Sequence, residues 1–254
     1  MRFSKWHALG NSYLVVERAE AGELTPERVR RLCDADTGIG SDGVLEIVSR
    51  SAARAEVVIW NPDGSVAEMS GNGVRIAARW LAGETGAHEV TIVTAGRETV
   101  ATMLGGPDAR MDVGEVVVGT PETLDVGERV ELVTASVGNP HAVIRMEAPA
   151  RSDLLRLGPA IETHPRFPER TNVQLARVAG RHNLEVLVWE RGAGETRSSG
   201  SSSVAAAAVA VVQGWCDSPV TVHLPGGDLV VALDGGRATL TGPAERICVG
   251  ETEI

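Results

Sequence analysis

The chain repeats part of its own sequence after about half its length. Three short segments recur in the same order, Gly10-Asn11 as Gly138-Asn139, Val58-Ile59-Trp60 as Leu187-Val188-Trp189, and Ser70-Gly71 as Ser199-Gly200. The offsets are 128, 129 and 129 residues in a chain of 254. Because order and spacing are both kept, the sequence predicts two copies of one structural unit.

A chain of this length also exceeds the usual size of a single hydrophobic core. The stretch Gly114–Thr123, rich in Gly and Val with Pro121, is the expected crossing between the copies. We therefore expect an N-terminal lobe over residues 1–114, joined by a C-terminal tail from about residue 245 to 254. The C-terminal lobe is expected over residues 115–244.

Each copy contains β-branched runs typical of strands and one apolar helix after its Ser-Gly pair. The expected strands cover residues 56–60, 89–93, 130–133, 142–145, 185–189, 220–224 and 229–233. Thr25-Pro26 predicts the start of a further helix, through Val29, Leu32 and Cys33. A helix from near Gly71 should bury Val74, Ile76, Ala77, Ala78 and Leu81. The expected fold is α+β, with two pseudo-symmetric lobes, each a mostly antiparallel, barrel-like sheet wrapped around a central helix.

Composition excludes several classes of protein. A net charge of −10 without a basic block argues against nucleic-acid binding. Residues 1–10 lack the apolar core of a signal peptide, and no apolar run is long enough to span a membrane. Cys33, Cys216 and Cys248 are far apart, and the six histidines have no metal-ligand spacing. These features predict a reduced, cytoplasmic protein without a bound metal.

The two Ser-Gly pairs are expected where a loop meets a helix. A helix N-terminus has unpaired N–H groups and a positive dipole end, so it binds anions. Two such ends on opposite sides of a carboxylate would place Ser70 and Ser199 on opposite faces of the attached carbon. That geometry suits removal of a proton from one face and its return from the other. The alternatives are a flexible linker around Ser198–Ser203 and ordinary helix capping by both serines.

Longer motifs extend along the whole chain. They are Phe3–Asn11, Gly38–Gly43, Asn61–Ser65 running into Glu68–Arg75, Gly138–His141, Arg166–Asn172 and Glu190–Thr196. On these motifs the sequence resembles the diaminopimelate epimerase family of cofactor-independent amino-acid racemases and epimerases. The resemblance implies that family's two-lobed fold and an isomerase that inverts an α-carbon by two-base 1,1-proton transfer.

The resemblance also implies roles for individual residues. Ser70 and Ser199 take the positions of the two proton-transfer groups, with His141 and Glu190 as polar partners beside them. Gly71, Asn72, Gly200 and Ser201 match the helix N-termini that grip the reacting carboxylate. The rest of the substrate, including its distal amino and carboxylate groups, would be held by Asn11, Asn61, Asn139, Asn172 and Arg191. Neither a pyridoxal lysine nor a glycine-rich dinucleotide loop is recognisable, so no cofactor is implied.

One departure lies at the centre of this pattern, because the family has cysteine where this chain has Ser70 and Ser199. A thiol has a pKa of about 8.5 and a hydroxyl is far less acidic, with a gap of about 7 units that corresponds to about 10 kcal/mol. A helix N-terminus returns only about 0.3–2 kcal/mol. Serine should therefore be a very poor base for an α-proton.

Three interpretations of the serines stay open. The chain is an epimerase whose two cysteines were replaced to trap substrate, a divergent isomerase that uses Glu190 or His141, or a non-catalytic amino-acid-binding protein. Ser202 and Ser203, where the family usually has Gly and Ala, favour natural divergence. The leading substrate is LL- or meso-diaminopimelate, an intermediate of lysine and cell-wall biosynthesis, and other polar amino acids are alternatives. The sequence does not determine the oligomeric state, and a homodimer stays open.

Overall fold

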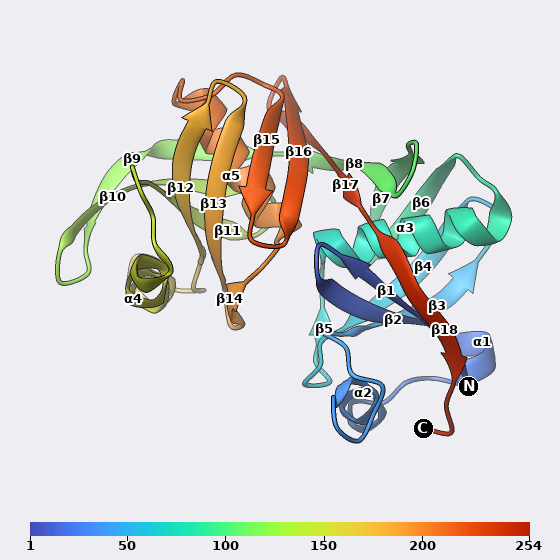
Figure 1. The fold of residues 1–254 in the computed structure, drawn as a ribbon. Helices are drawn as coiled ribbons and strands as arrows, with labels where there is room; N and C mark the ends of the chain where they lie inside the picture. Colours follow the sequence, from blue (N-terminus) through green and yellow to red (C-terminus); the bar gives the residue numbers. More distant parts are fainter. The chain divides into compact units, whose positions relative to one another are not determined.

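The computed structural model describes residues 1–254, and the chain divides into two compact units (Figure 1). Unit 1 comprises Met1–Asp112 and Gly242–Ile254, and unit 2 comprises Val113–Thr241. The chain enters unit 2 within strand β8 (Asp108–Glu115) and returns within strand β17 (Arg237–Pro243). The stretch 114–123 forms the end of β8 and most of strand β9 (Val117–Asp125).

Unit 1 is one twisted sheet with a long helix against it. Its remaining elements are β1 (Arg2–Ala8), β2 (Asn11–Glu17), α1 (Arg18–Ala21), α2 (Pro26–Cys33), β3 (Val44–Arg50), β4 (Arg54–Trp60), β5 (Val66–Ala67), α3 (Gly71–Thr85), β6 (Glu89–Thr94), β7 (Arg97–Met103) and β18 (Glu245–Glu251). The strands pair in the order β18-β1-β2-β3-β4-β6-β7-β8, and β5 pairs with β4. The β2–β3 and β4–β6 pairs are parallel, and the others are antiparallel.

Unit 2 has the same plan. Its further elements are β10 (Arg129–Ser136), β11 (Pro140–Arg145), α4 (Arg151–Glu162), β12 (Asn172–Gly180), β13 (Asn183–Glu190), β14 (Gly194–Thr196), α5 (Gly200–Val212), β15 (Val220–Leu224) and β16 (Gly227–Asp234). The strands pair in the order β9-β10-β11-β12-β13-β15-β16-β17, with β14 on β13. Here β11–β12 and β13–β15 are the parallel pairs.

The two units are therefore copies of one topology. Helices α2 and α4 join the first parallel pair of each unit, and α3 and α5 join the second. The parallel pairs arise because a helical crossover returns the chain to the same end of the sheet, whereas a tight turn reverses its direction. The predicted α+β class with two pseudo-symmetric, mostly antiparallel lobes is confirmed.

The long helices form the centre of each core. Helix α3 contacts β1, β2, β4, β6 and β7, and α5 contacts strands from β9 to β16. All the residues predicted for the buried face of α3 are at most 1% exposed: Val74, Ile76, Ala77, Ala78 and Leu81. In α5 the run from Val204 to Ala210 is at most 2% exposed, since small side chains let the sheet close around the whole helix. The structure also confirms Thr25 as N-cap of α2, where its side chain accepts a hydrogen bond from Arg28 N.

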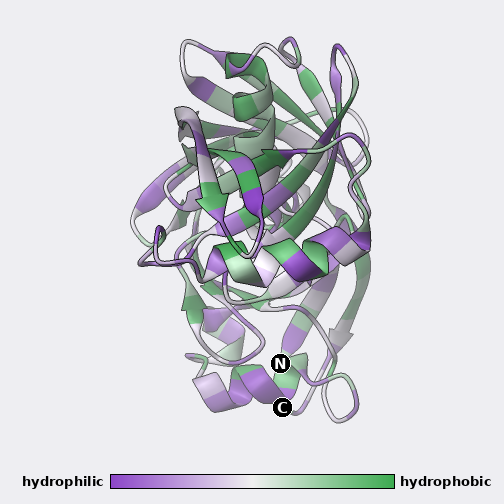
Figure 2. Ribbon diagram, turned by 90° about the vertical axis from the view of Figure 1, so that its left-hand side faces the viewer, coloured by the Kyte–Doolittle hydropathy of each residue, from purple (hydrophilic) through white to green (hydrophobic).

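Hydrophilic and hydrophobic residues alternate along most strands and helices, as expected where one face packs against a core (Figure 2). Both chain termini belong to unit 1 and lie close together, because β18 pairs with β1 (Figure 1). None of the helices is both long and apolar enough to cross a membrane.

Candidate active site

In unit 1, Ser70 is the N-cap of the central helix α3. Its backbone is extended, with φ −142° and ψ 117°, and its Oγ accepts a hydrogen bond from Gly73 N at 3.1 Å. The hydroxyl of Tyr13, on β2, lies 3.1 Å from the same oxygen. The first turn of α3, at Gly71 and Asn72, lies at the positive end of the helix dipole.

A short chain of amides and one guanidinium supports this helix start. Asn72 Nδ2 donates to Asn11 Oδ1 at 3.1 Å, and Asn72 Oδ1 accepts from Arg75 Nη2 at 2.7 Å. Arg75 is completely buried, and burial lowers its pKa to about 10, although the charge of Asp108 opposes the shift. Arg75 also donates to Gly71 O at 3.3 Å, so it fixes the first turn on two sides.

Asn61 lies at the end of β4, in the turn that the motif Asn61–Ser65 predicts. Its Nδ2 donates to Ser65 Oγ at 2.9 Å, and its backbone N donates to Ser65 O at 2.8 Å. Gly64, with a left-handed φ of 83°, closes this turn against the backbone of Pro26. The half-buried amide of Asn61 is thus held in a fixed orientation by its own loop.

In unit 2, Ser199 is the N-cap of α5 with nearly the same backbone, φ −143° and ψ 121°. Its side chain does not cap the helix but is hydrogen-bonded to Glu190, at the end of β13. Burial raises the pKa of Glu190, and the hydrogen bond from Ser199 opposes the shift. Gly200 and Ser201 form the first turn, as Gly71 and Asn72 do in unit 1.

His141, on β11, lies inside a polar network rather than at the surface. Its Nε2 is 2.9 Å from Asn139 Oδ1, and its Nδ1 is 3.1 Å from Gln174 Nε2. Gln174 Nε2 also donates to Ser202 Oγ at 3.0 Å. Since an amide nitrogen only donates, Nδ1 is the acceptor and Nε2 carries the proton. Burial lowers the pKa of this completely buried histidine to about 3, so it is neutral at physiological pH.

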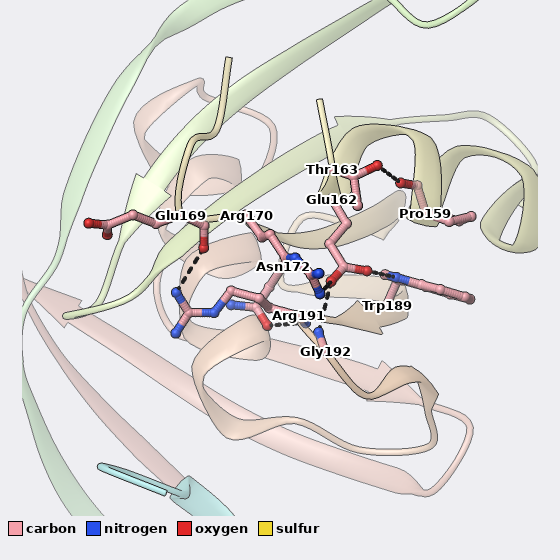
Figure 3. Close-up of polar contacts among 9 residues, drawn as sticks. All are labelled: Pro159, Glu162, Thr163, Glu169, Arg170, Asn172, Trp189, Arg191 and Gly192. Carbon is pink, nitrogen blue, oxygen red and sulfur yellow. Dashed lines mark hydrogen bonds and ion pairs between the residues drawn. The ribbon is translucent and has the colours of Figure 1, made fainter. Parts of the chain in front are cut away.

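A second network holds the turn after β13 (Figure 3). Asn172 Nδ2 donates to Pro140 O at 2.9 Å, and its Oδ1 accepts from Arg191 N at 3.0 Å. Glu162 accepts from Gly192 N at 2.8 Å and from Trp189 Nε1 at 2.7 Å, so it secures the same turn from α4. The exposed guanidinium of Arg191 donates to the backbone O of Glu169 at 3.2 Å.

The structure thus joins several residues that the sequence singled out. Asn11 meets Asn72, Ser199 meets Glu190, Asn139 meets His141, and Asn172 meets the backbone of Arg191. It adds Tyr13, Gln174 and Glu162, which sequence reasoning missed. The available signal was weak, a polar group next to apolar strand residues for Tyr13 and Gln174, and a helix-terminal acid for Glu162.

None of the thiols lies at either serine position. Cys33 in α2 and Cys216 after α5 are buried, and burial raises both of their pKa values. Cys248 is exposed on β18. No cluster of three or more His, Cys, Asp or Glu side chains is arranged to hold a metal ion. The titratable groups hydrogen-bonded to the serines are Tyr13 in unit 1 and Glu190 in unit 2.

Known proteins are similar to this chain along nearly its entire length. The profile of the family described as diaminopimelate epimerase matches residues 3–119 and 133–247. A diaminopimelate epimerase of Stutzerimonas stutzeri (strain A1501) is 36% identical over 274 aligned positions, which cover 100% of this chain and 99% of the relative.

Two solved structures share the fold. One is a predicted epimerase from Pseudomonas aeruginosa, with a TM-score of 0.75 and 18% identity, covering 100% of this chain and 99% of that one. The other is a phenazine biosynthesis protein of the PhzF family from Bacillus anthracis, with a TM-score of 0.75, 15% identity and the same coverage. At such low identity these two show the fold alone.

Proposed function

The chain belongs to the diaminopimelate epimerase family and is an isomerase of the epimerase type, and from this premise we propose that it inverts the α-carbon of a polar amino acid by two-base 1,1-proton transfer. The leading substrate is LL- or meso-diaminopimelate. The reaction requires one group that removes the α-proton and a second that returns a proton, and each unit supplies one candidate, Ser70 or Ser199. No cofactor takes part in this proposal.

One observation carries the proposal. Each unit places a serine at the N-cap of its central helix, and a titratable side chain is hydrogen-bonded to the hydroxyl of that serine. The donors of the first turns, at Gly71, Asn72, Gly200 and Ser201, suit the carboxylate attached to the reacting carbon. That carboxylate must be held while the adjacent C–H bond breaks, because its charge rises as a carbanion forms.

The distal end of the substrate needs groups of both polarities. Asn11, Asn61, Asn139 and Asn172 offer amide oxygens that can accept from an ammonium group, and Arg191 offers a guanidinium for a carboxylate. The networks that orient these side chains support this assignment, because a fixed donor loses little entropy on binding. In this scheme His141 is neutral and completely buried, so it orients Asn139 and does not exchange a proton with substrate.

The serines determine the expected rate. A hydroxyl is several pKa units less acidic than a thiol, so we expect this chain to exchange α-protons far more slowly than a form carrying cysteine at both positions. A second candidate function is a divergent isomerisation in which Glu190 is the base. Glu190 suits that role better than His141, because the pKa of Glu190 is raised and its carboxyl group is hydrogen-bonded to Ser199, whereas the pKa of His141 is lowered.

The experiment incubates the protein with LL-diaminopimelate in D₂O and follows loss of the α-proton signal by NMR. It compares the chain as it is with Ser70→Cys/Ser199→Cys, and adds Glu190→Gln in both backgrounds. We expect slow exchange and conversion to the meso form in the serine chain, and an increase of at least about 100-fold in the cysteine form.

The other functions give different results. One such result is exchange or product formation that is no faster in the cysteine form than in the serine chain. If Glu190→Gln also abolishes it, the result would favour the divergent isomerase. Calorimetric binding of diaminopimelate without exchange in either form would indicate an amino-acid-binding protein and contradict the proposal.

A further inference from the structure

Tyr13 is the only tyrosine of the chain, and it contacts the proton-transfer position of unit 1. It is the third residue of β2, its side chain is 6% exposed, and its hydroxyl lies 3.1 Å from Ser70 Oγ. Because 57 residues separate the two in sequence, the contact depends on how β2 and the start of α3 pack together.

The tyrosine ring lies in a space that a glycine leaves open. A Cβ on Gly43 would lie 2.6 Å from Tyr13 Cε1 and 2.5 Å from Trp60 O, both closer than real contacts allow. Gly43 is at the same time bound to the tyrosine's strand, since Leu14 N donates to Gly43 O at 3.1 Å. The missing side chain and this backbone bond together fix the direction in which the Tyr13 hydroxyl points.

The hydrogen bonds at Ser70 allow two arrangements of the protons. Its oxygen already accepts from Gly73 N, and a hydroxyl has one proton and two lone pairs. When Tyr13 donates to the second lone pair, the proton of Ser70 stays free for another acceptor. When Ser70 instead donates to Tyr13, its oxygen can accept a proton from elsewhere. The pair can therefore pass a proton in either direction.

We propose that Tyr13 is the positioning residue and proton partner of Ser70, an inference that rests on the proposed epimerase function. In the returning step the Ser70 O–H bond breaks, and the carbanion's electron pair forms the new C–H bond. The Tyr13 proton then moves to Ser70 Oγ, and the phenolate later takes a proton from water. In the opposite direction each transfer is reversed, and nothing is oxidised or reduced.

Acidity is the reason that a tyrosine suits this place. A phenol has a pKa of about 10, close to the 8.5 or so of a thiol, whereas an alcohol is far less acidic than either. The phenol thus supplies most of the acidity that serine lacks. In unit 2 the corresponding partner of Ser199 is a carboxyl group, that of Glu190. The two serines consequently differ in their proton partner even though the sequence around them repeats.

The test uses Tyr13→Phe, which removes only the hydroxyl oxygen and keeps the ring that fits against Gly43. Inversion of LL-diaminopimelate in D₂O is measured for the parent, Tyr13→Phe, Ser70→Cys and the double variant. We expect Tyr13→Phe to slow inversion by about 100-fold or more in the Ser70 background. In the Ser70→Cys background, where the thiol carries its own acidity, the loss should be less than about 3-fold. A purely structural role of the hydroxyl would give equal losses in both backgrounds.

A second readout separates the two half-sites. In Tyr13→Phe, the unit 2 group should still exchange the α-proton of one stereoisomer with retention, so the ratio of exchange to inversion should rise. Thr94→Val, which removes another buried hydroxyl of unit 1, is the control and should leave this ratio unchanged. Circular dichroism verifies that every variant is folded.

The outcomes distinguish this inference from the proposed function. Three results would overturn the role of Tyr13 and leave the epimerase function standing. They are equal losses in both backgrounds, an unchanged ratio of exchange to inversion in Tyr13→Phe, and exchange by the cysteine form with none by the serine chain. Absence of exchange in every form, cysteine variants included, would overturn both.

Discussion

At the scale of single residues, the two serines illustrate how one repeated motif acquires two environments. Ser70 caps its helix through Gly73 N and contacts a phenol, whereas Ser199 has no capping bond and contacts a carboxyl group. The backbone conformations are nearly identical, so the difference lies entirely in the side chains brought by neighbouring strands. The difference between the two helix starts also includes Ser202 and Ser203, which are both completely buried at the start of α5.

His141 gives a prediction at this scale. Its pKa is about 3 when folded, against about 6.5 when unfolded, so the unfolded chain binds the extra proton first as the pH falls. The resulting stability is complete above pH 6.5 or so and is lost progressively toward pH 3. Between pH 7.5 and 5 we expect this group to cost about 2 kcal/mol of unfolding free energy.

Urea unfolding at several pH values measures this effect in the parent and in His141→Gln. The variant should lose about 2 kcal/mol less than the parent between the two pH values. His182→Gln, which removes an exposed histidine of the same unit, should retain the parent's pH dependence. An identical slope in the parent and His141→Gln would mean that His141 is protonated in the folded protein.

At the scale of elements, α4 shows how close packing fixes a binding turn. Gly158 brings the helix against Trp189 of β13, and a Cβ there would lie 2.7 Å from the indole ring. The ring cannot easily move away, because its Nε1 donates to Glu162 at the end of the same helix (Figure 3). Glu162 also accepts from Gly192 N, so the position of α4 and that of the Arg191 turn depend on each other.

Substitution of this glycine should therefore be costly. We expect Gly158→Ala to lower the free energy of unfolding by about 1–3 kcal/mol through overpacking. Gly83→Ala in α3 is the matched control, because nothing lies within 4 Å of its added Cβ. Helix propensity alone should make that variant up to about 1 kcal/mol more stable. Urea denaturation measures both, and equal effects would show that the contact with Trp189 is not tight.

At the scale of the whole molecule, unit 1 is built from both ends of the chain. Strand β18 pairs with β1 from Arg2↔Glu251 to His7↔Glu245, and Arg28 donates to the backbone O of Ile254. Unit 2 is continuous in sequence, so all of its strands come from one stretch. The last residues are consequently part of the N-terminal fold and not an appendage.

Removal of Glu245–Ile254 should act on one unit only. Without β18, strand β1 becomes an edge, and we expect its backbone amides to exchange with solvent at least about 10-fold faster, a change of about 1.4 kcal/mol in local stability. The amides of β12 and β13 should keep their protection. Hydrogen-exchange mass spectrometry resolves these segments, and uniform loss of protection in both units would contradict the prediction.

Much of the fold was predictable from local signals. The cap Thr25, the helix start at Gly71, the apolar face of α3 and the Ala-rich run of α5 depend on neighbours within one or two helical turns, and all are found as expected. The parallel pairs β2–β3 and β11–β12 were not predicted, because a pairing direction depends on where a crossover helix packs. Strand ends also shifted by a few residues, as hydrogen bonding to neighbours extends them.

The sequence by itself determined that the molecule consists of two copies of one unit and that each copy places a serine at a helix start, because repetition, periodicity and capping are local properties of the chain. Only the tertiary structure decided that Tyr13 contacts Ser70 and that Gln174 contacts both His141 and Ser202. In each of these pairs the two residues lie 28 or more positions apart in sequence. Which side chain reaches which helix end depends on register and on spaces such as that above Gly43, and both exist only after the sheet has closed around its helix.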